Sequence, residues 1–171
     1  MGAKSIIQGK YYPSIYSRVI WLLLAINAFA SIVALKNSPG VFLLAGLGLL
    51  GNLLIFVLSL KKSKKVFGVT ELISSVLLLL SLGIWVFTNL PLLNLTISLI
   101  AYFIGAIPTY RKVLKNPNDE DLLFWLFFAL ASLLTLVGTD KAHISAYLYP
   151  LYFAVFDGGM ALLCLRRCIT K

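Results

Sequence analysis

Residues 107–125, IPTYRKVLKNPNDEDLLFW, join two apolar stretches of the chain through a short polar connection. The first apolar stretch runs into Pro108 and a basic cluster. An acidic turn then leads into the second stretch, which carries Trp125 near its start. Proline and clustered charge mark the ends of helices, so this segment predicts two helices that run in opposite directions. The acidic residues at 118–121 are expected to cap the second helix.

The composition of the whole chain indicates where these helices lie. Of the 171 residues, 60% are hydrophobic and only 12% are charged, and the mean hydropathy is +0.95. A soluble domain has roughly half apolar and about a quarter charged residues. We therefore expect a single integral membrane domain over residues 1–171, because no long polar segment separates its apolar runs.

Six apolar runs are long enough to cross a hydrocarbon core of about 30 Å as helices. They cover residues 19–36, 40–60, 67–88, 91–110, 121–138 and 143–165. The expected fold class is thus an all-α membrane protein with six transmembrane helices.

The lysines and arginines predict the orientation of these helices. With six spans, four of the polar segments share one side of the membrane, and they hold 13 of the 15 lysines and arginines. Basic segments are retained in the cytoplasm, so both termini are expected there, in a multi-pass protein of the cell (inner) membrane. This topology, together with anionic lipid headgroups, explains the net charge of +9, and nucleic acid is not an expected partner.

Two parts of the sequence match each other as an internal repeat. Pro13 and Trp21 have the same spacing as Pro117 and Trp125. Further along, GNLLIFVLSLKK at 51–62 matches FDGGMALLCLRR at 156–167, with a polar residue second and a dibasic pair at the end of each.

These matches predict two parallel repeats, an arrangement found in one large group of transporters. Repeat A covers residues 9–62 and contains two spans. Repeat B covers residues 91–167 and contains three, and residues 67–88 form a linker helix between them.

Residues 107–125 also resemble the signature of the PQ-loop superfamily, which includes the SWEET and SemiSWEET sugar transporters. In that family a helix ends in Pro-Gln, a basic stretch follows, and a polar turn leads into a helix that bears tryptophan. Thr109 stands here where the family has glutamine. The resemblance implies a 3+1+3 fold that lacks its first helix in this chain, giving 2+1+3 spans. Either the helix is missing or the start of the chain is wrongly assigned.

Two polar residues at mid-depth form the predicted substrate site. Asn52 and Asp157 each precede a dibasic pair by nine residues, about 13 Å along a helix. A polar group in hydrocarbon is costly unless it is paired or hydrated, so both are candidates for function. The repeat would bring them face to face, and the resemblance implies an asparagine at the corresponding positions of the substrate pocket. The alternative is that both residues only clamp helices together.

Other residues are assigned by their depth and type. Tyr152, Asn27 and Tyr102 are further substrate-binding candidates, and Pro108 and Pro150 are candidate hinges. We expect Trp21, Trp125, Tyr147 and Tyr149 to lie in interfacial aromatic belts, and Glu71 to reach water at the end of its span.

The sequence predicts a carrier for a small polar solute, such as a sugar or similar metabolite, that works by alternating access around the midplane site. The alternative is a membrane scaffold or subunit that keeps the fold and does not transport. No catalytic constellation or metal-ligand cluster is recognisable, so neither an enzyme nor a cofactor nor a metal site is expected. The expected partners are the solute, the lipid bilayer and a second copy of the chain in a homodimer, in which Gly46, Gly48 and Gly51 are candidates for the contact.

Overall fold

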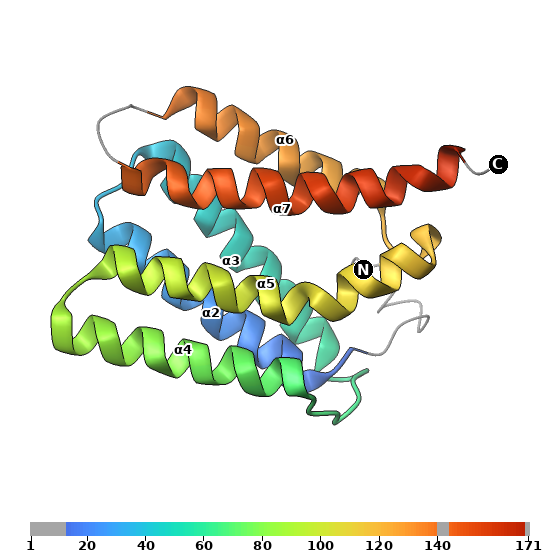
Figure 1. The fold of residues 1–171 in the computed structure, drawn as a ribbon, viewed down its shortest axis with the longest axis horizontal. Coiled ribbons are helices and arrows are strands. Elements are labelled where there is room, and N and C mark those ends of the chain that lie inside the picture. Colours follow the sequence, from blue (N-terminus) through green and yellow to red (C-terminus); the bar gives the residue numbers. More distant parts are fainter. Residues whose placement is uncertain (1–12, 140–143, 170–171) are drawn as a thin grey trace.

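The computed structural model describes residues 13–139 and 144–169, and its regular elements are helices (Figure 1). Six α-helices and one short 3-10 helix follow one another within these residues, labelled here as in the figure. They are α2 (Ile15–Ala34), α3 (Pro39–Ser59), α4 (Val69–Thr88), α5 (Pro91–Lys115), η1 (Pro117–Asp119), α6 (Leu122–Gly138) and α7 (Ile144–Ile169). The expectation of an all-helical fold is confirmed. The predicted start of repeat A, residues 9–12, and both chain ends lie outside the described residues.

Helix α5 is longer than the sequence predicts. The expected span stops at residue 110, because the polar stretch 111–121 follows it. The helix instead passes through Pro108 and continues to Lys115. It ends at Asn116, whose backbone N–H still donates to the Lys112 carbonyl and whose side chain accepts a hydrogen bond from the Asn118 N–H. The basic cluster is therefore the last turn of α5 and not a loop.

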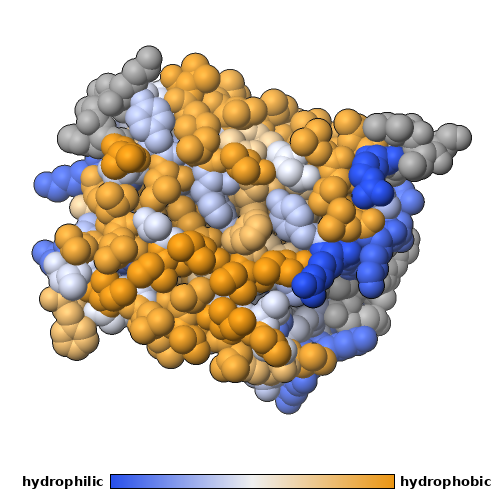
Figure 2. All heavy atoms as spheres, viewed as in Figure 1, coloured by the Kyte–Doolittle hydropathy of each residue, from blue (hydrophilic) through white to orange (hydrophobic). Residues whose placement is uncertain are grey.

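Five of the six helices are long and apolar enough to cross a membrane. The sixth, α6, has 17 residues, about 26 Å at 1.5 Å per residue, slightly less than a hydrocarbon core of about 30 Å. Apolar side chains cover much of the face shown in Figure 2, and strongly hydrophilic residues gather mainly at one end of it. This basic end carries the exposed side chains of Lys61, Lys64, Arg111, Lys115 and Arg166. The chain is thus a multi-pass membrane protein.

Four of the helices form a ring. Helix α2 packs against α3 and α5, and α7 packs against the same two helices from the opposite side. Within the described residues the backbones of α2 and α7, and those of α3 and α5, do not come close across the ring, so only side chains meet there. Helix α4 lies outside it against α5 and α2, and α6 lies against α7 and α3 (Figure 1). Helices α2 and α3 are antiparallel neighbours, and so are α6 and α7. Any short connection between two helices produces this arrangement. It is therefore not evidence for the internal repeat, which stays a prediction.

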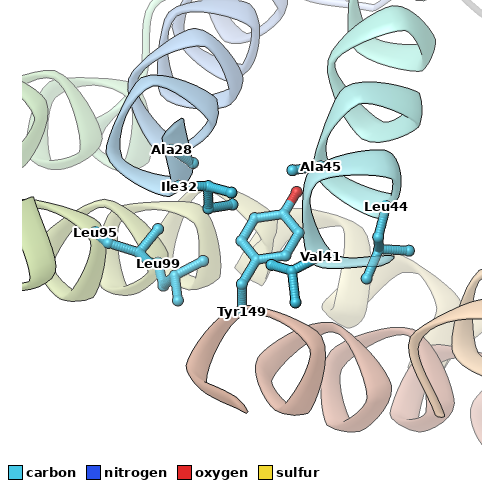
Figure 3. Packing of buried hydrophobic residues seen from close by; sticks show 8 residues of the cluster. All are labelled: Ala28, Ile32, Val41, Leu44, Ala45, Leu95, Leu99 and Tyr149. Carbon is cyan, nitrogen blue, oxygen red and sulfur yellow. The ribbon is translucent and has the colours of Figure 1, made fainter. Parts of the chain in front are cut away.

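A cluster of buried side chains packs inside the ring, toward the end opposite the basic end (Figure 3). We call this cluster the apolar seal. It comes from four helices, and its members are Ala28, Ile32, Val41, Leu44, Ala45, Leu95, Leu99 and Tyr149. Tyr149 is the one aromatic ring among them, and Figure 3 shows it extending from α7 toward α2 and α3.

Polar residues set several helix ends. Asp121 accepts a hydrogen bond from the backbone N–H of Leu123 at 3.0 Å, which confirms that the acidic run caps α6. Asn89 ends α4 in the left-handed conformation, with φ of 53°, so that the chain reverses within two residues. Two backbone hydrogen bonds of Lys64 join the connection after α3 to the start of α2. The Lys64 N–H donates to the Pro13 carbonyl, and the Lys64 carbonyl accepts from the Ile15 N–H.

Candidate functional site

A cavity of about 240 Å³ lies within the helix ring. Its walls come from α2, α3, α5, α6 and α7, with Glu71 of α4 at one edge. Some lining residues, such as Ser17 and Thr109, lie near the basic end of their helices. Others, Leu44 and Tyr149, belong to the apolar seal. The cavity therefore extends from the basic end to the seal.

Helix α7 contributes a stripe of three residues to the cavity wall. Tyr149, Phe153 and Asp157 all line it, and they follow one another at intervals of four. Residues four apart lie on one face of an α-helix, one above the other, so a single face of α7 supplies the stripe. The rings of Tyr149 and Phe153 are in contact, with centroids 4.7 Å apart. The stripe thus leads from the seal to a carboxyl group.

Asp157 is a buried carboxyl group, and the described residues leave one of its two oxygens without a hydrogen bond. The residue is only 3% exposed, and its Oδ2 atom has no hydrogen-bond partner among the described residues. The nearby Tyr110 hydroxyl donates instead to the backbone carbonyl of Phe156. Removing a carboxylate from water without a compensating partner is strongly unfavourable. Asp157 is therefore placed to bind something that enters the cavity.

Asn52 lines the same cavity from α3. Its amide Nδ2 donates to the Gly48 carbonyl of its own helix at 2.9 Å, and no hydrogen bond from Asn52 to another helix is present in the described part of the chain. The side chain is half-buried. Its contacts are therefore those of a cavity-lining amide, and not of a clamp between helices.

The other predicted residues divide between the cavity and the core. Tyr102 and Pro108 line the cavity, and the Tyr102 hydroxyl donates to the Trp21 carbonyl at 3.2 Å. Tyr152 does not line it, because its ring stacks on Phe156 with centroids 5.6 Å apart. Pro150, fully buried, lies inside α7.

Asn27 lies away from the cavity in a polar cluster between α2, α4 and α5. It exchanges two side-chain hydrogen bonds with Asn94, at 3.0 and 2.9 Å, and the two hydrogens of its Nδ2 are shared among Asn94, Ser81 and Ser98. Ser31 completes the cluster by accepting from Asn94. All five side chains are buried. The structure thus places Asn27 in a satisfied contact between helices.

Both tryptophans predicted for an interfacial belt line the cavity. The belt expectation is wrong for Trp125 and Tyr149, which are 7% and 6% exposed. Their depth alone suggested the belt, but the rotation of each helix about its axis turns them inward. The spacing of four that joins Tyr149, Phe153 and Asp157 is the sequence signal that could have identified the wall.

The sequence predicts that Glu71 reaches water, but the structure shows its carboxylate bonded within the protein. It is half-buried at the edge of the cavity and accepts hydrogen bonds from the Ser17 hydroxyl, the Thr70 hydroxyl and the Gly68 backbone N–H. Through the last of these bonds Glu71 satisfies the backbone N–H of the N-cap residue at the start of α4. Glu71 therefore ties α2 to α4.

Four lining side chains each keep one buried polar atom without a hydrogen-bond partner among the described residues. These atoms are Asp157 Oδ2, Trp125 Nε1, Ser132 Oγ and Arg18 Nε. Buried polar atoms in proteins are nearly always hydrogen-bonded to protein or to water, so such a concentration around one cavity indicates a hydrated or solute-binding space.

The three α3 glycines that were predicted for the dimer contact, Gly46, Gly48 and Gly51, face other parts of the same chain. A Cβ atom at Gly48 would lie 3.3 Å from the Tyr149 hydroxyl, and one at Gly46 would lie 3.6 Å from the Phe29 ring. Gly51 lines the cavity and has no atom within 4 Å of that position. These glycines therefore make room within one chain, and the homodimer stays a prediction that they do not support.

No protein-family model, no curated protein and no solved structure matches this chain. The function must therefore be inferred from the cavity.

Proposed function

We propose that the chain is a membrane carrier for a small polar solute that binds in the central cavity between Asn52 and Asp157. One observation carries the proposal: Asp157, a buried carboxyl group with one oxygen that has no hydrogen-bond partner among the described residues, belongs to the lining of a cavity inside a bundle of membrane-spanning helices. A solute that crosses hydrocarbon must exchange its water for protein groups at mid-depth. Asn52 on α3 and Asp157 on α7 are the groups available for that exchange.

The size of the cavity suits a small metabolite. About 240 Å³ is below the usual range of about 300 to 1,000 Å³ for sites that bind drug-sized ligands. Eight aromatic residues line it, and they supply apolar contact around the polar groups. A sugar or a metabolite of similar size is therefore the expected kind of solute.

The proposed route across the membrane is open toward the basic end and closed at the apolar seal. The cavity extends from the basic end, which we assign to the cytoplasm of the cell membrane because basic segments are retained there. The apolar seal separates it from the other side. Transport requires that the seal opens and the basic end closes, and Pro108 in α5 and Pro150 in α7 are the candidate hinges for this motion. The resemblance to the PQ-loop superfamily leads to the same expectation of alternating access.

Uptake by liposomes that contain the purified protein tests the proposal. Radiolabelled glucose, alanine, choline and succinate are offered separately, because these solutes differ in charge. At least one should enter faster than into protein-free liposomes, and Asn52→Leu and Asp157→Leu should each lower that uptake at least tenfold. Ser59→Ala is the matched control, since Ser59 is a buried polar residue of α3 that bonds to its own helix and does not line the cavity.

The same assay decides between a carrier and a membrane scaffold. Variants are compared only if their circular dichroism and gel-filtration profiles match those of the wild type. Uptake of no solute, or uptake that both leucine variants preserve, would favour the scaffold or subunit.

A further inference from the structure

The walls of the cavity combine aromatic rings with a carboxyl group. The aromatic residues that line it are Trp21, Tyr102, Phe124, Trp125, Phe128, Tyr149, Phe153 and Phe156. They come from four different helices. Asn52 on α3 and Ser132 on α6 also belong to the lining and lie at about the same distance along their helices from the basic end as Asp157.

The aromatic rings form a continuous wall. Trp21 contacts Tyr102 at 5.4 Å between ring centroids, and Tyr102 contacts Phe153 at 6.0 Å. Phe153 then contacts Phe156 at 6.2 Å, and Phe156 contacts Trp125 at 6.2 Å. The wall therefore runs from α2 through α5 and α7 to α6. Asp157 follows Phe156 directly and lies one turn beyond Phe153 on α7, so it lines the same cavity as these rings.

Asp157 differs from Glu71, another acidic residue of the lining, in that no described residue bonds to its side chain. No ion pair joins it to any described residue, and its Oδ2 atom is without a hydrogen bond there. Glu71 is engaged by three donors, and Glu120 also has an interaction within the protein. Arg18, a basic residue of the lining, lies one turn from the start of α2, near the basic end. Asp157 lies about 13 Å along α7 from the dibasic pair at that end.

From this arrangement we infer that the solute is a small organic cation, an amine or a quaternary ammonium compound, for which Asp157 is the counter-ion. The inference rests on the proposed function, because it names the class of solute that the same cavity takes. Aromatic faces attract cations through the negative charge of their π-systems, and the attraction strengthens where water is excluded. A neutral polyol would gain hydrogen bonds from Asp157 but would not balance its charge.

A matched pair of probes tests the inference directly. Choline and 3,3-dimethyl-1-butanol have nearly the same shape, and they differ in that a charged nitrogen replaces a carbon. Binding to the full-length protein in lipid nanodiscs is measured by isothermal titration calorimetry. Tryptophan fluorescence provides a second signal because Trp21 and Trp125 line the cavity. Choline should bind at least tenfold more tightly than the neutral isostere.

Two pairs of variants connect this preference to the cavity. Asp157→Asn should reduce the preference for choline to less than threefold, whereas Asp157→Glu should retain most of it. Asp121→Asn removes the same charge outside the cavity, and asparagine also caps helices well, so the preference should remain. Phe153→Leu should weaken choline binding several-fold, and Phe127→Leu, at an exposed position of α6, should not.

Equal affinity for the two probes, or binding of neither, would overturn the inference. This comparison uses the wild-type protein, so it decides the question even if Asp157→Asn fails to fold. Uptake of glucose by the liposomes together with equal affinity for the two probes would reject the organic cation while leaving the proposed carrier in place.

Discussion

Asn27 and Asn94 exchange two hydrogen bonds, at 3.0 and 2.9 Å, between helices α2 and α5, and both side chains are buried. Each asparagine satisfies the donor and the acceptor of the other, and serines around them satisfy further positions. Such a pair holds two helices in one relative position, because a shift of either helix breaks both bonds at once.

We predict that Asn27→Leu destabilises the fold by about 1 to 3 kcal/mol, since it leaves the amide of Asn94 buried and partly unsatisfied. The double variant Asn27→Leu/Asn94→Leu should be less destabilised than the two single variants added together. Unfolding in detergent, followed by circular dichroism in a double-mutant cycle, measures the coupling. Strict additivity would show that the pair does not couple the helices.

The contrast between Asn27 and Asn52 shows what sequence can predict in such a protein. Hydropathy located the helices, and the repeat alignment selected two polar residues, Asn52 and Asp157, that line one cavity. The depth of a residue in the membrane follows from its position along its helix. The helices and these two cavity residues could therefore be predicted from the sequence.

The rotation of each helix about its axis was much harder to predict. Lipid is as apolar as the protein core, so a membrane helix is hydrophobic on most of its faces and its sequence gives little indication of which face packs. Trp125 was for this reason assigned to the membrane surface although it is buried. Asn94 lies one turn into α5, and only the position of Asn27 on α2 explains its burial.

The topology can be tested by thiol labelling. We expect a cysteine at Lys64 to react with a membrane-impermeant maleimide only from the cytoplasmic side, and a cysteine at Asn89 only from the outside. Both positions are accessible to solvent, and they lie at opposite ends of α4. The native Cys164 and Cys168 are first replaced by serine. Labelling of both positions from the same side would contradict an odd number of crossings between them.

Two glycines of α3 form a matched pair for testing the cavity wall. Gly48→Ala places a methyl group 3.3 Å from the Tyr149 hydroxyl, so that ring must shift. Gly51→Ala meets no atom within 4 Å. We predict that Gly48→Ala changes solute affinity or uptake at least threefold, whereas Gly51→Ala changes it less than twofold. A larger effect of Gly51→Ala than of Gly48→Ala would show that the position of the Tyr149 ring does not depend on the space beside Gly48.

The last prediction concerns Tyr149 as the part of the apolar seal that closes the cavity. Its side chain lines the cavity and packs among the seal residues of α2, α3 and α5, as Figure 3 shows. Tyr149→Ala removes the ring and leaves a hole in the seal. Tyr149→Phe keeps the ring and removes only the hydroxyl, for which no hydrogen bond is present in the described residues.

A cysteine at Gly51, which lines the cavity from α3 and where an added Cβ meets no atom within 4 Å, serves as the reporter. In the wild-type background and in Tyr149→Phe, we expect a small impermeant thiol reagent to reach it only from the basic end, because the seal blocks the other route. Tyr149→Ala should make the reporter reactive from both sides, with a rate from the sealed side at least tenfold higher than before. A reporter that reacts equally fast from the sealed side in the wild-type background would show that the seal does not close the cavity. Equal opening by Tyr149→Phe would instead assign the closure to the hydroxyl and not to the packing of the ring.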